Sequence, residues 1–395
     1  MVKILAVNAG SSSLKWKLFE MPAQKVLAAG LIEKIGLEDS KFSFTVENKN
    51  YQEQLTIPNH EAAVDCLLDI LKKYQIVNQL SEIKGVGHRF VNGGSLFSSS
   101  VIIDDLVLQQ MEQVKELAPL HNPGNILAIR AFKHELPQAT SVAVFDTGFH
   151  QTLPPVNYLY SLPYEFFEKY HVRKFGAHGI SYHYVFNRLL TVSKEAKAKT
   201  NAVIMHLGSG ASICAVKNGK SYDTSMGFSP VSGITMQTRS GDVDASLLVY
   251  LQEKLKITPQ QMLDILNHKS GLLGISGISS DMRDILAEID TVPQAKLSID
   301  IFVNRVIKYI GAYLTELEHT NDLVFTGGIG ENVPLVRRLV CNKLKLFGVE
   351  LSEKNEKAKG KVALISSPAS KIAVWVIPTN EELMIAKEVF KLGNY

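Results

Sequence analysis

Hydrophobic and polar positions form short, regular stretches along this chain, beginning at its N-terminus. An apolar run at residues 4–7 is followed by a segment in which Leu14, Trp16 and Leu18 alternate with polar side chains. Alternation at period two predicts a half-buried strand. We therefore expect two strands joined by a small, hydroxyl-rich turn, with Asn8 at its entrance and Lys15 at its exit.

The remainder of the chain alternates between strand-like and helix-like patterns. Residues 61–74 and 301–318 each carry apolar side chains on one helical face, a pattern that indicates core packing. Short apolar runs bounded by Gly or polar turns predict buried strands at residues 85–91, 141–145, 202–207, 323–326 and 372–377. Such alternation predicts an α/β protein.

Several predicted strands end in Gly-rich or charged loops, at residues 146–148, 208–212 and 327–332. Ligands of open α/β sheets bind beyond the carboxyl ends of strands, so we expect these loops to line one cleft. Residues 203–216 also repeat the strand, Gly/Ser turn and strand pattern of the first hairpin. A domain boundary is expected near residues 150–160, and residues 290–296, around Pro293, are expected to form a surface connection.

The turn at residues 8–15 has two interpretations. Its backbone N–H groups, Ser hydroxyls and Lys15 ammonium suit a polyphosphate. It also suits an ordinary tight hairpin, and the turn alone does not decide between them. It is not a P-loop, because GxxxxGK[ST] does not occur there and a P-loop opens a helix.

Composition narrows the class of protein. A chain of 395 residues suggests two domains of roughly 150–200 residues each. The net charge of +3 does not favour a nucleic-acid partner, and no apolar stretch reaches the length of a membrane span. The three cysteines lie far apart without metal-ligand spacing, and the N-terminus enters a strand directly. These features predict a cytoplasmic protein with no membrane association.

Eleven segments taken in order carry a more specific signal, which covers the chain from residue 2 to about 388. They are residues 8–15, 88–94, 118–123, 145–150, 176–179, 206–212, 223–227, 238–242, 280–283, 327–332 and 378–382. Together they resemble the acetate/propionate kinase family. The resemblance implies two related domains of the sugar kinase/Hsp70/actin-like (ribonuclease H-like) fold around a nucleotide cleft. The resemblance places the first domain at residues 1–150, with the C-terminal segment 380–395 packing back on it. It places the second domain at residues 151–379.

The resemblance also implies the reaction: reversible, Mg²⁺-dependent phosphoryl transfer from ATP to acetate, giving acetyl phosphate and ADP. Propionate or another short-chain carboxylate is the alternative acceptor, and Mn²⁺ is an alternative metal. The resemblance further implies a homodimer and a role in acetyl-CoA biosynthesis. A nucleotide-binding sensor of the same fold that has lost catalysis, and a sugar kinase, are the remaining hypotheses. No sugar-hydroxyl site is evident in the sequence.

The chemistry of the reaction is consistent with the residues available. A carboxylate is already ionised at neutral pH, so the main obstacle is its repulsion from the γ-phosphoryl group. Cations placed around the transferring group relieve that repulsion. By resemblance, the catalytic residues are Arg89, Asp146, His178 and Arg239. For Asp146 we favour the orientation of an arginine, or of a water near the metal, over proton abstraction.

The resemblance assigns the other site residues as well. Substrate binding falls to Arg89 with Val91, Leu120 and Pro230, and the metal to Asn8 and Glu381. The nucleotide contacts are Lys15, Ser11, Ser13, His206, Leu207, Gly208, Ser209, Gly210, Asp281, Met282, Arg283, Gly328, Ile329, Gly330, Glu331 and Asn332.

Structural interpretations stand beside some of these assignments. Arg239 is also placed to form a salt bridge with Asp242 or Asp244. Glu381 is also suited to stabilise a helix N-terminus. His121 is a weaker candidate for the cleft, whereas the side chains of His150 and His206 are expected to be structural.

The chain departs from the family pattern at four positions. Ala177 stands where Phe is usual, Ser209 where Asn is usual, Gln237 where Gly is usual and Tyr182 where His is common. The smaller side chain at position 177 predicts extra space for the acyl group, so we expect acetate to be a substrate and propionate to be accepted unusually well.

Overall fold

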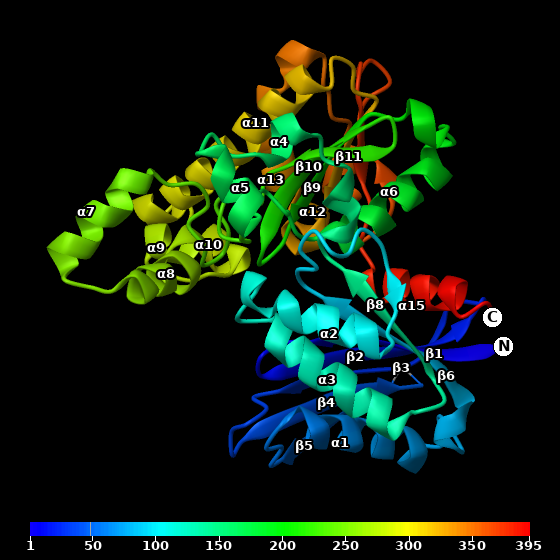
Figure 1. The fold of residues 1–395 in the computed structure, drawn as a ribbon. Helices are drawn as coiled ribbons and strands as arrows, with labels where there is room; N and C mark the ends of the chain where they lie inside the picture. The colour runs from blue at the N-terminus through cyan, green and yellow to red at the C-terminus, as the bar shows by residue number, and fades with distance from the viewer. Residues whose placement is uncertain (48) are drawn as a thin grey trace. The chain divides into compact units, whose positions relative to one another are not determined.

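The computed structural model describes residues 1–47 and 49–395 (Figure 1). Its contacts divide the chain into two compact units, one formed by Met1–Phe149 together with Asn380–Tyr395 and the other by His150–Thr379. Each unit is built on its own mixed sheet with helices, which confirms the predicted α/β class. Among the helices that the structure describes, none is both long and apolar enough to cross a membrane.

The first unit has an eight-stranded sheet of order β5-β4-β3-β2-β1-β6-β8-β7. Its strands are β1 (Val2–Ala9), β2 (Ser13–Met21), β3 (Lys25–Glu33), β4 (Ser40–Val46), β5 (Lys49–Leu55), β6 (Ile83–Phe90), β7 (Val101–Ile102) and β8 (Thr140–Phe145). Its helices are α1 (His60–Lys73), α2 (Asp105–Gln113), α3 (Asn122–Glu135) and α15 (Glu381–Leu392).

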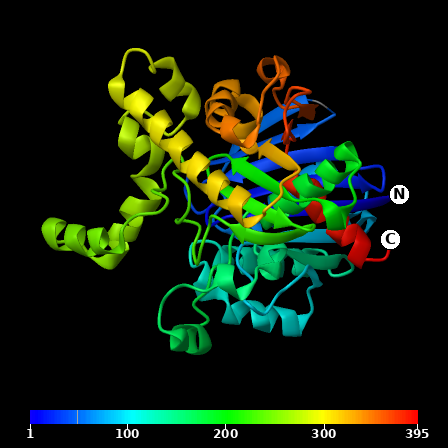
Figure 2. The same ribbon diagram turned by 90° about the horizontal axis from the view of Figure 1, so that it is seen from above.

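The second unit has a six-stranded sheet of order β11-β10-β9-β12-β14-β13. Its strands are β9 (Ala202–Leu207), β10 (Ala211–Lys217), β11 (Lys220–Thr224), β12 (Asp322–Thr326), β13 (Ala363–Leu364) and β14 (Ala373–Val376). Its helices are α4 (Pro155–Tyr158), α5 (Tyr164–Tyr170), α6 (Gly179–Ser193), α7 (Ala245–Leu255), α8 (Pro259–His268), α9 (Gly271–Ser276), α10 (Met282–Ala287), α11 (Pro293–Glu316), α12 (Gly327–Asn332), α13 (Pro334–Lys343) and α14 (Lys354–Lys357). Figure 2 shows α11 as a long helix beside the strands of this unit, and it packs on β9 and β10.

The two sheets share a five-strand topology. In the first unit β3, β2 and β1 form an antiparallel meander, and β6 and β8 then add in parallel beside β1. In the second unit β11, β10 and β9 form the meander, and β12 and β14 add in parallel beside β9. The similarity between the two sequence hairpins therefore reflects a repeated topology.

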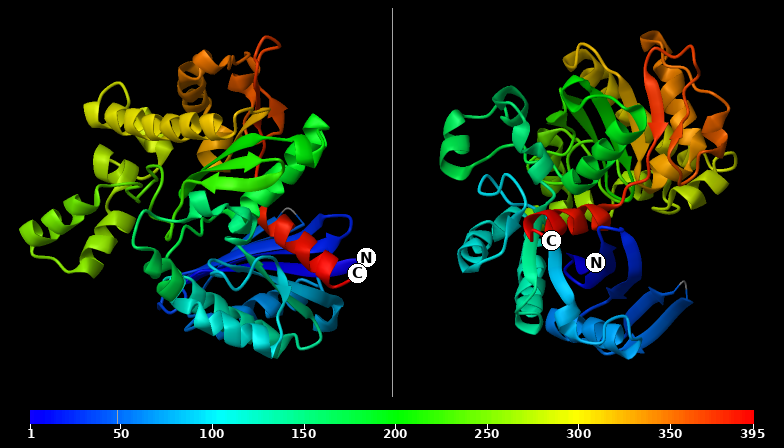
Figure 3. Two further views of the ribbon diagram at one scale, coloured as in Figure 1. Left: turned by 45° about the horizontal axis from the view of Figure 1, so that its top comes forward. Right: turned by 90° about the vertical axis from the view of Figure 1, so that its right-hand side faces the viewer.

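Alternation in β2 separates the two faces of the first sheet. Leu14, Trp16 and Leu18 are fully buried in the core formed with α1 and α3. The lysines between them lie on the opposite face, where α15 packs on β1, β2, β6 and β8 (Figure 3). Arg89 shares that opposite face by the same alternation, since it lies two residues after Gly87, which touches α15.

Two sequence predictions are wrong in detail. Residues 327–332 form the short helix α12 and not a loop, because Glu331 accepts a hydrogen bond from the Gly327 N–H (2.9 Å) and caps the first turn. Residues 290–296 are not simply a surface connection. Pro293 begins α11, a position where the missing N–H of proline costs no helical hydrogen bond.

Glycines in β6 allow α15 to approach the sheet closely. A Cβ atom at Gly87 would lie 2.3 Å from Ile385 Cγ2 and 2.7 Å from Val389 Cγ2, and one at Gly85 would lie 2.4 Å from Val389 Cγ1. These distances are far below van der Waals contact. A side chain at either position would push α15 away from the sheet.

We therefore expect Gly87→Ala to destabilise the protein by about 1–3 kcal/mol through overpacking. Gly311→Ala is the matched control, because Gly311 lies within α11 and a Cβ atom there meets nothing within 4 Å. Alanine is favoured over glycine in a helix interior by about 0.5–1 kcal/mol, so this variant should be as stable as the parent or more so. Urea unfolding measures both, and equal midpoints for Gly87→Ala and the parent would contradict the close packing.

Candidate active site

In the first unit, three of the predicted site residues, Asn8, Arg89 and Asp146, meet where β1, β6 and β8 end. Arg89 lies one residue before the end of β6, and Asp146 follows β8 directly. Asp146 Oδ2 accepts hydrogen bonds from Arg89 Nε (2.9 Å) and Nη2 (2.5 Å), and Asn8 Oδ1 accepts one from Arg89 Nη1 (3.1 Å). The fold thus gathers three residues that are far apart in the sequence around one guanidinium.

The electrostatics of this cluster are dominated by burial and by mutual charge. Burial tends to lower the pKa of Arg89, but the charges of Asp146 and Glu381 outweigh this effect and raise the pKa. Glu381 is the first residue of α15. Burial raises the pKa of the Glu381 carboxyl, and the negative charge of Asp146 adds to this effect while Arg89 opposes it. Arg89 therefore stays charged, and the carboxyl groups compete for its positive charge.

Glu381 is the N-terminal acid of α15, as its helix-stabilising interpretation expects, and it also lies near Arg89. The capping contact itself comes from Asn380, whose Oδ1 accepts a hydrogen bond from Leu383 N (3.2 Å). Asp146 is 1% exposed, and its Oδ1 atom has no hydrogen-bond partner among the described residues. An unpaired buried carboxylate oxygen is costly, so it marks a position suited to a further donor or cation.

Lys15 is held by a different carboxylate. Its Nζ atom lies 2.5 Å from Glu382 Oε1, and Lys17 Nζ lies 3.1 Å from Glu382 Oε2. Burial tends to raise the pKa of Glu382, but Lys15 and Lys17 outweigh it and lower the pKa. The predicted nucleotide contact Lys15 therefore projects from β2 beside α15, half-exposed and paired with an ionised glutamate.

The other predicted residues of the first unit lie on loops or near strand ends. Asn8 and Lys15 face each other across β1 and β2, and the turn consists of residues 10–12. Ser11 is exposed and Ser13 is half-buried. Val91 is buried directly after β6, whereas Leu120 is 53% exposed.

In the second unit, the structure brings His178, Gly210 and Arg239 together. His178 precedes α6 with φ +58°, in the left-handed region. A Cβ atom at Gly210 would lie 3.2 Å from His178 Nε2 and 3.6 Å from Arg239 Nη1. Arg239 Nη1 also donates to the Pro230 carbonyl (3.0 Å). Glycine at position 210 therefore lets the turn pass directly beside an imidazole and a guanidinium.

The two carboxylates considered as salt-bridge partners of Arg239 form hydrogen bonds with other groups in the structure. Asp242 Oδ1 accepts a hydrogen bond from Gly233 N (2.7 Å), and Asp242 Oδ2 accepts one from the Tyr309 hydroxyl (2.5 Å). Asp244 Oδ1 caps α7 by accepting from Ser246 N (2.7 Å).

Two serines attach His178 and His206 to the core of this unit. His178 Nδ1 lies 2.8 Å from Ser212 Oγ, and His206 Nδ1 lies 2.8 Å from Ser181 Oγ. The two imidazole rings stack with their centroids 4.3 Å apart. His206, the last residue but one of β9, is thus fixed between the sheet and α6.

The predicted nucleotide segments divide into buried and exposed parts. Leu207 is fully buried at the end of β9, ahead of the turn that contains Gly208 and Ser209. In α12, Ile329 is buried and Gly328 has open space where a Cβ atom would be. Glu331 Oε1 accepts hydrogen bonds from the Gly327 N–H (2.9 Å) and the Thr379 N–H (3.1 Å), so its carboxylate binds the protein's own backbone.

The remaining predicted nucleotide contacts lie at the ends of short helices. Asn332 Nδ2 donates to the Gly328 carbonyl (3.0 Å) at the end of α12. Asp281 caps α10 by accepting from Arg283 N (2.8 Å), and hydrogen bonds from Arg283 lower the pKa of Asp281 to about 2. Met282 is buried and the Arg283 side chain is exposed.

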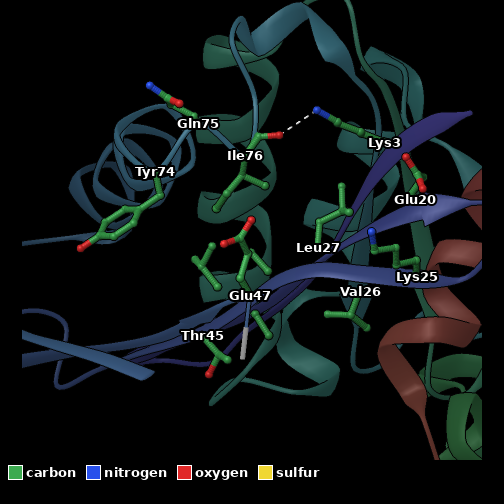
Figure 4. A pocket seen from close by; sticks show the side chains of 13 residues that line it. Lys3, Glu20, Lys25, Val26, Leu27, Thr45, Glu47, Tyr74, Gln75 and Ile76 are labelled. Atoms are coloured by element: carbon green, nitrogen blue, oxygen red, sulfur yellow. Dashed lines mark hydrogen bonds between the residues drawn. The ribbon is translucent and has the colours of Figure 1, made fainter. Parts of the chain in front are cut away.

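A cavity of about 600 Å³ in the first unit lies away from these residues (Figure 4). It is lined by residues of β2, β3 and β4 and by the end of α1, and Lys3 Nζ donates to the Ile76 carbonyl (2.7 Å) at its edge. None of the predicted site residues lines it.

Comparisons with known proteins give a consistent result. The model of the acetokinase family matches residues 3–387. The acetate kinase of Bacillus cytotoxicus is 50% identical over 395 residues, 100% of both chains. The crystal structure of Porphyromonas gingivalis acetate kinase superposes with a TM-score of 0.96 at 42% identity, covering 99% of this chain and 100% of that one. A propionate kinase from Francisella tularensis gives a TM-score of 0.92 at 39% identity, covering 98% and 99%. The predicted sugar kinase/Hsp70/actin-like fold is thereby confirmed.

One buried residue with a role beside the site was missed by the sequence analysis. Arg337, in α13, is 0% exposed and donates to the carbonyl groups of Gly330 (2.8 Å), Glu331 (3.0 Å) and Ala358 (2.8 Å). It also donates to Asn355 Oδ1 (2.8 Å) and to the Asn355 carbonyl (2.7 Å). Burial lowers the pKa of Arg337 to about 10, and the guanidinium closes the C-terminal end of α12.

We expect Arg337→Lys to lower the free energy of unfolding by about 2–4 kcal/mol, because an ammonium has only three donors for five acceptors and leaves carbonyl groups unsatisfied. Arg338→Lys is the control, since Arg338 is half-exposed and pairs with Glu356 at the surface. That change should stay within about 0.5 kcal/mol of the parent. If both variants unfold at the same urea concentration, Arg337 does not hold this segment.

Proposed function

This chain belongs to the acetokinase family, and we propose that it transfers the γ-phosphoryl group of ATP to acetate, giving acetyl phosphate and ADP in a reversible, Mg²⁺-dependent reaction. The observation that carries the proposal is a pair of clusters of polar side chains, one in each unit, near the carboxyl ends of strands. One is centred on Arg89 and the other on His178 and Arg239. Each cluster suits one part of the chemistry.

The Arg89 cluster suits the carboxylate substrate. A guanidinium binds a carboxylate through two parallel hydrogen bonds, and Asp146 fixes the orientation of the Arg89 fork from one side. Acetate is ionised at neutral pH, so no base is needed to activate it. In this proposal Asp146 orients Arg89 and takes no proton from the substrate.

The same cluster fits a magnesium ion by the chemistry of its donors. Mg²⁺ prefers oxygen ligands and is held in proteins by one or two side chains with waters and phosphate oxygens. Asn8 Oδ1, the Glu381 carboxylate and the unpaired Asp146 Oδ1 provide such oxygens. Asn8 and Glu381 would hold the ion, which when bound supplies positive charge to the phosphoryl oxygens.

The residues of the second unit suit the phosphoryl group. His178 Nε2 and Arg239 Nη1 both lie beside Gly210. An imidazole N–H donor and a fixed cation at one backbone turn can stabilise negative charge on a transferring phosphoryl group. The residues of α12 and of the Gly208–Gly210 turn supply backbone that a nucleotide can approach without side-chain clashes.

The side chain at position 177 bears on the length of the acyl chain that the site accepts. Ala177 is buried in the core of the second unit, and its side chain is smaller than the Phe usual in the family. A high TM-score is shared with both an acetate kinase and a propionate kinase. We propose that acetate and propionate are both substrates.

We also propose that the protein is a homodimer in the cytoplasm. Helix α7 buries none of its residues, and Leu247, Val249, Tyr250 and Leu255 are between 42% and 56% exposed. Exposed apolar groups of this size are typical of interaction surfaces. The three cysteines are free thiols, as expected for a reducing compartment.

Trapping the acyl phosphate with hydroxylamine tests the reaction. With ATP and Mg²⁺, we expect product from acetate and propionate and a lower kcat/KM for butyrate. Arg239→Lys should lower kcat by about 10²–10³, because the ammonium lacks the second donor of the guanidinium. Arg338→Lys makes the same change at the surface and should retain full activity.

Absence of acyl phosphate at high enzyme concentration would refute the kinase proposal and favour a nucleotide-binding sensor. A large preference for acetate over propionate would instead refute only the argument from Ala177. Equal activity of the two Arg→Lys variants would show that Arg239 does not stabilise the transferring group.

The dimer is tested by light scattering. The double variant Val249→Asp with Tyr250→Asp places two charges on α7 and is expected to yield a monomer, because burying charges at an interface is unfavourable. Leu346→Asp is the control, since Leu346 is 78% exposed outside α7. A dimeric double variant would exclude α7 as the interface, and a monomeric parent would exclude the dimer.

A further inference from the structure

In the second unit, a line of hydrogen-bonded hydroxyl groups connects a buried tyrosine to His178. The Tyr182 hydroxyl lies 2.5 Å from Ser212 Oγ, and Ser212 Oγ lies 2.8 Å from His178 Nδ1. Tyr182 and Ser212 are both 0% exposed, whereas His178 is half-buried. Tyr182 lies within α6 and Ser212 within β10, so two rigid elements hold the line in place.

From this geometry we infer that Tyr182 is a positioning residue which, through Ser212, keeps the imidazole proton of His178 on Nε2, the nitrogen beside Gly210. This inference rests on the proposed function, because it assigns the Nε2 proton to a phosphoryl oxygen of the substrate. It adds a residue to the site that does not itself touch the reacting atoms.

The direction of the hydrogen bonds follows from the chemistry of the three groups. A phenol is a stronger donor than an alcohol and a weaker acceptor, so Tyr182 donates to Ser212. A hydroxyl that accepts one hydrogen bond becomes a better donor, so Ser212 donates to His178 Nδ1. A neutral imidazole carries one proton, and when Nδ1 is the acceptor that proton resides on Nε2.

The surroundings keep the phenol able to donate. Burial raises the pKa of Tyr182 well above its usual value, although its hydrogen bond with Ser212 and one with the His206 backbone oppose the shift. The phenol therefore retains its proton at neutral pH. His206 stacks on His178 and limits rotation of the imidazole ring.

The consequence for the site is a donor aimed at the Gly208–Gly210 turn. A Cβ atom at Gly210 would lie 3.2 Å from His178 Nε2, so this nitrogen faces the turn, next to the guanidinium of Arg239. With the opposite tautomer, Nε2 would present a lone pair toward the negative oxygens of a phosphoryl group. Repulsion would then replace a hydrogen bond.

The test is the tautomer of His178 in the full-length protein, measured by NMR with ¹⁵N-labelled histidine and assigned by the loss of its signals in His178→Gln. We expect the Nε2–H form in the parent and a mixture of both forms in Tyr182→Phe, which removes only the phenolic hydroxyl. We also expect kcat for acetyl phosphate formation to fall by about tenfold with little change in KM for ATP, as for one lost hydrogen bond of about 1.4 kcal/mol in the transition state.

Tyr313→Phe is the matched control. Tyr313 is a buried tyrosine of the same unit, and its hydroxyl has no hydrogen-bond partner among the described residues. This variant should leave both the tautomer and kcat unchanged. Ser212→Ala provides a second test should Tyr182→Phe fail to fold, and it should likewise give a mixture of tautomers.

Retention of the parent tautomer in the variants, or a changed tautomer with unchanged kcat, would overturn the inference. A lower kcat without a change of tautomer would also overturn it, because Tyr182 would then serve only the packing. These outcomes are separate from the proposed function. If the parent forms no acyl phosphate, the kinase proposal fails while the NMR result still decides whether Tyr182 controls the tautomer.

Discussion

The ion pair between Arg89 and Asp146 is the interaction on which the polar end of the first unit depends. A guanidinium that is mostly shielded from water is strongly unfavourable unless a carboxylate neutralises it and its N–H groups are bonded. Asp146 satisfies two of these groups and Asn8 a third. Since these residues come from β6, from the end of β8 and from β1, the Arg89 guanidinium joins side chains of three neighbouring strands. The positive charge of Arg89 offsets part of the cost of burying the Glu381 carboxylate there.

The second unit holds His178 and His206 through neutral groups. Its central strands have the same order as those of the first unit. Hydroxyl groups hold these two histidines, whereas a carboxylate holds Arg89 in the first unit. His206 reaches Ser181 and then Thr379, whereas His178 reaches Ser212 and then Tyr182. Hydroxyl chains add no charge to a region that is expected to receive phosphate. The two units therefore share a topology but hold their polar side chains differently, with an ion pair in the first and with hydroxyl groups in the second.

Periodicity predicted much of this fold because it reports directly on burial. The alternating segment at β2 and the apolar runs of β6, β8, β9 and β12 are all strands. Short helices whose stability comes from distant groups were beyond such reasoning. α12 is Gly-rich and six residues long, and it is stabilised by Glu331 at one end and by Arg337 at the other.

Prediction of the candidate site had a similar limit. Arg89 and Asp146 could be selected because each lies at the end of a predicted strand, yet only the sheet order shows that the two strands are neighbours. Arg337 carries no signal in the sequence. It stands beside Arg338 in an amphipathic helix, and only the packing of the 355–358 segment distinguishes the buried guanidinium from the surface one. Likewise, the pairing of Lys15 with Glu382 joins residues far apart along the chain.

The first unit is assembled from two segments that are separated by the whole second unit, and this imposes an order on its biosynthesis. Domains generally fold as units while the ribosome still adds residues. Here the second unit is one continuous segment, whereas the sheet of the first lacks α15 until the second unit and then residues 381–392 have been translated. Until then, the glycine-lined face of β6 has no helix to cover it, and Tyr395 has yet to bond the Lys84 carbonyl and Thr140. Residues 1–149 of the nascent chain must therefore persist with an exposed apolar face, and the first unit is completed only after the whole second unit has been translated.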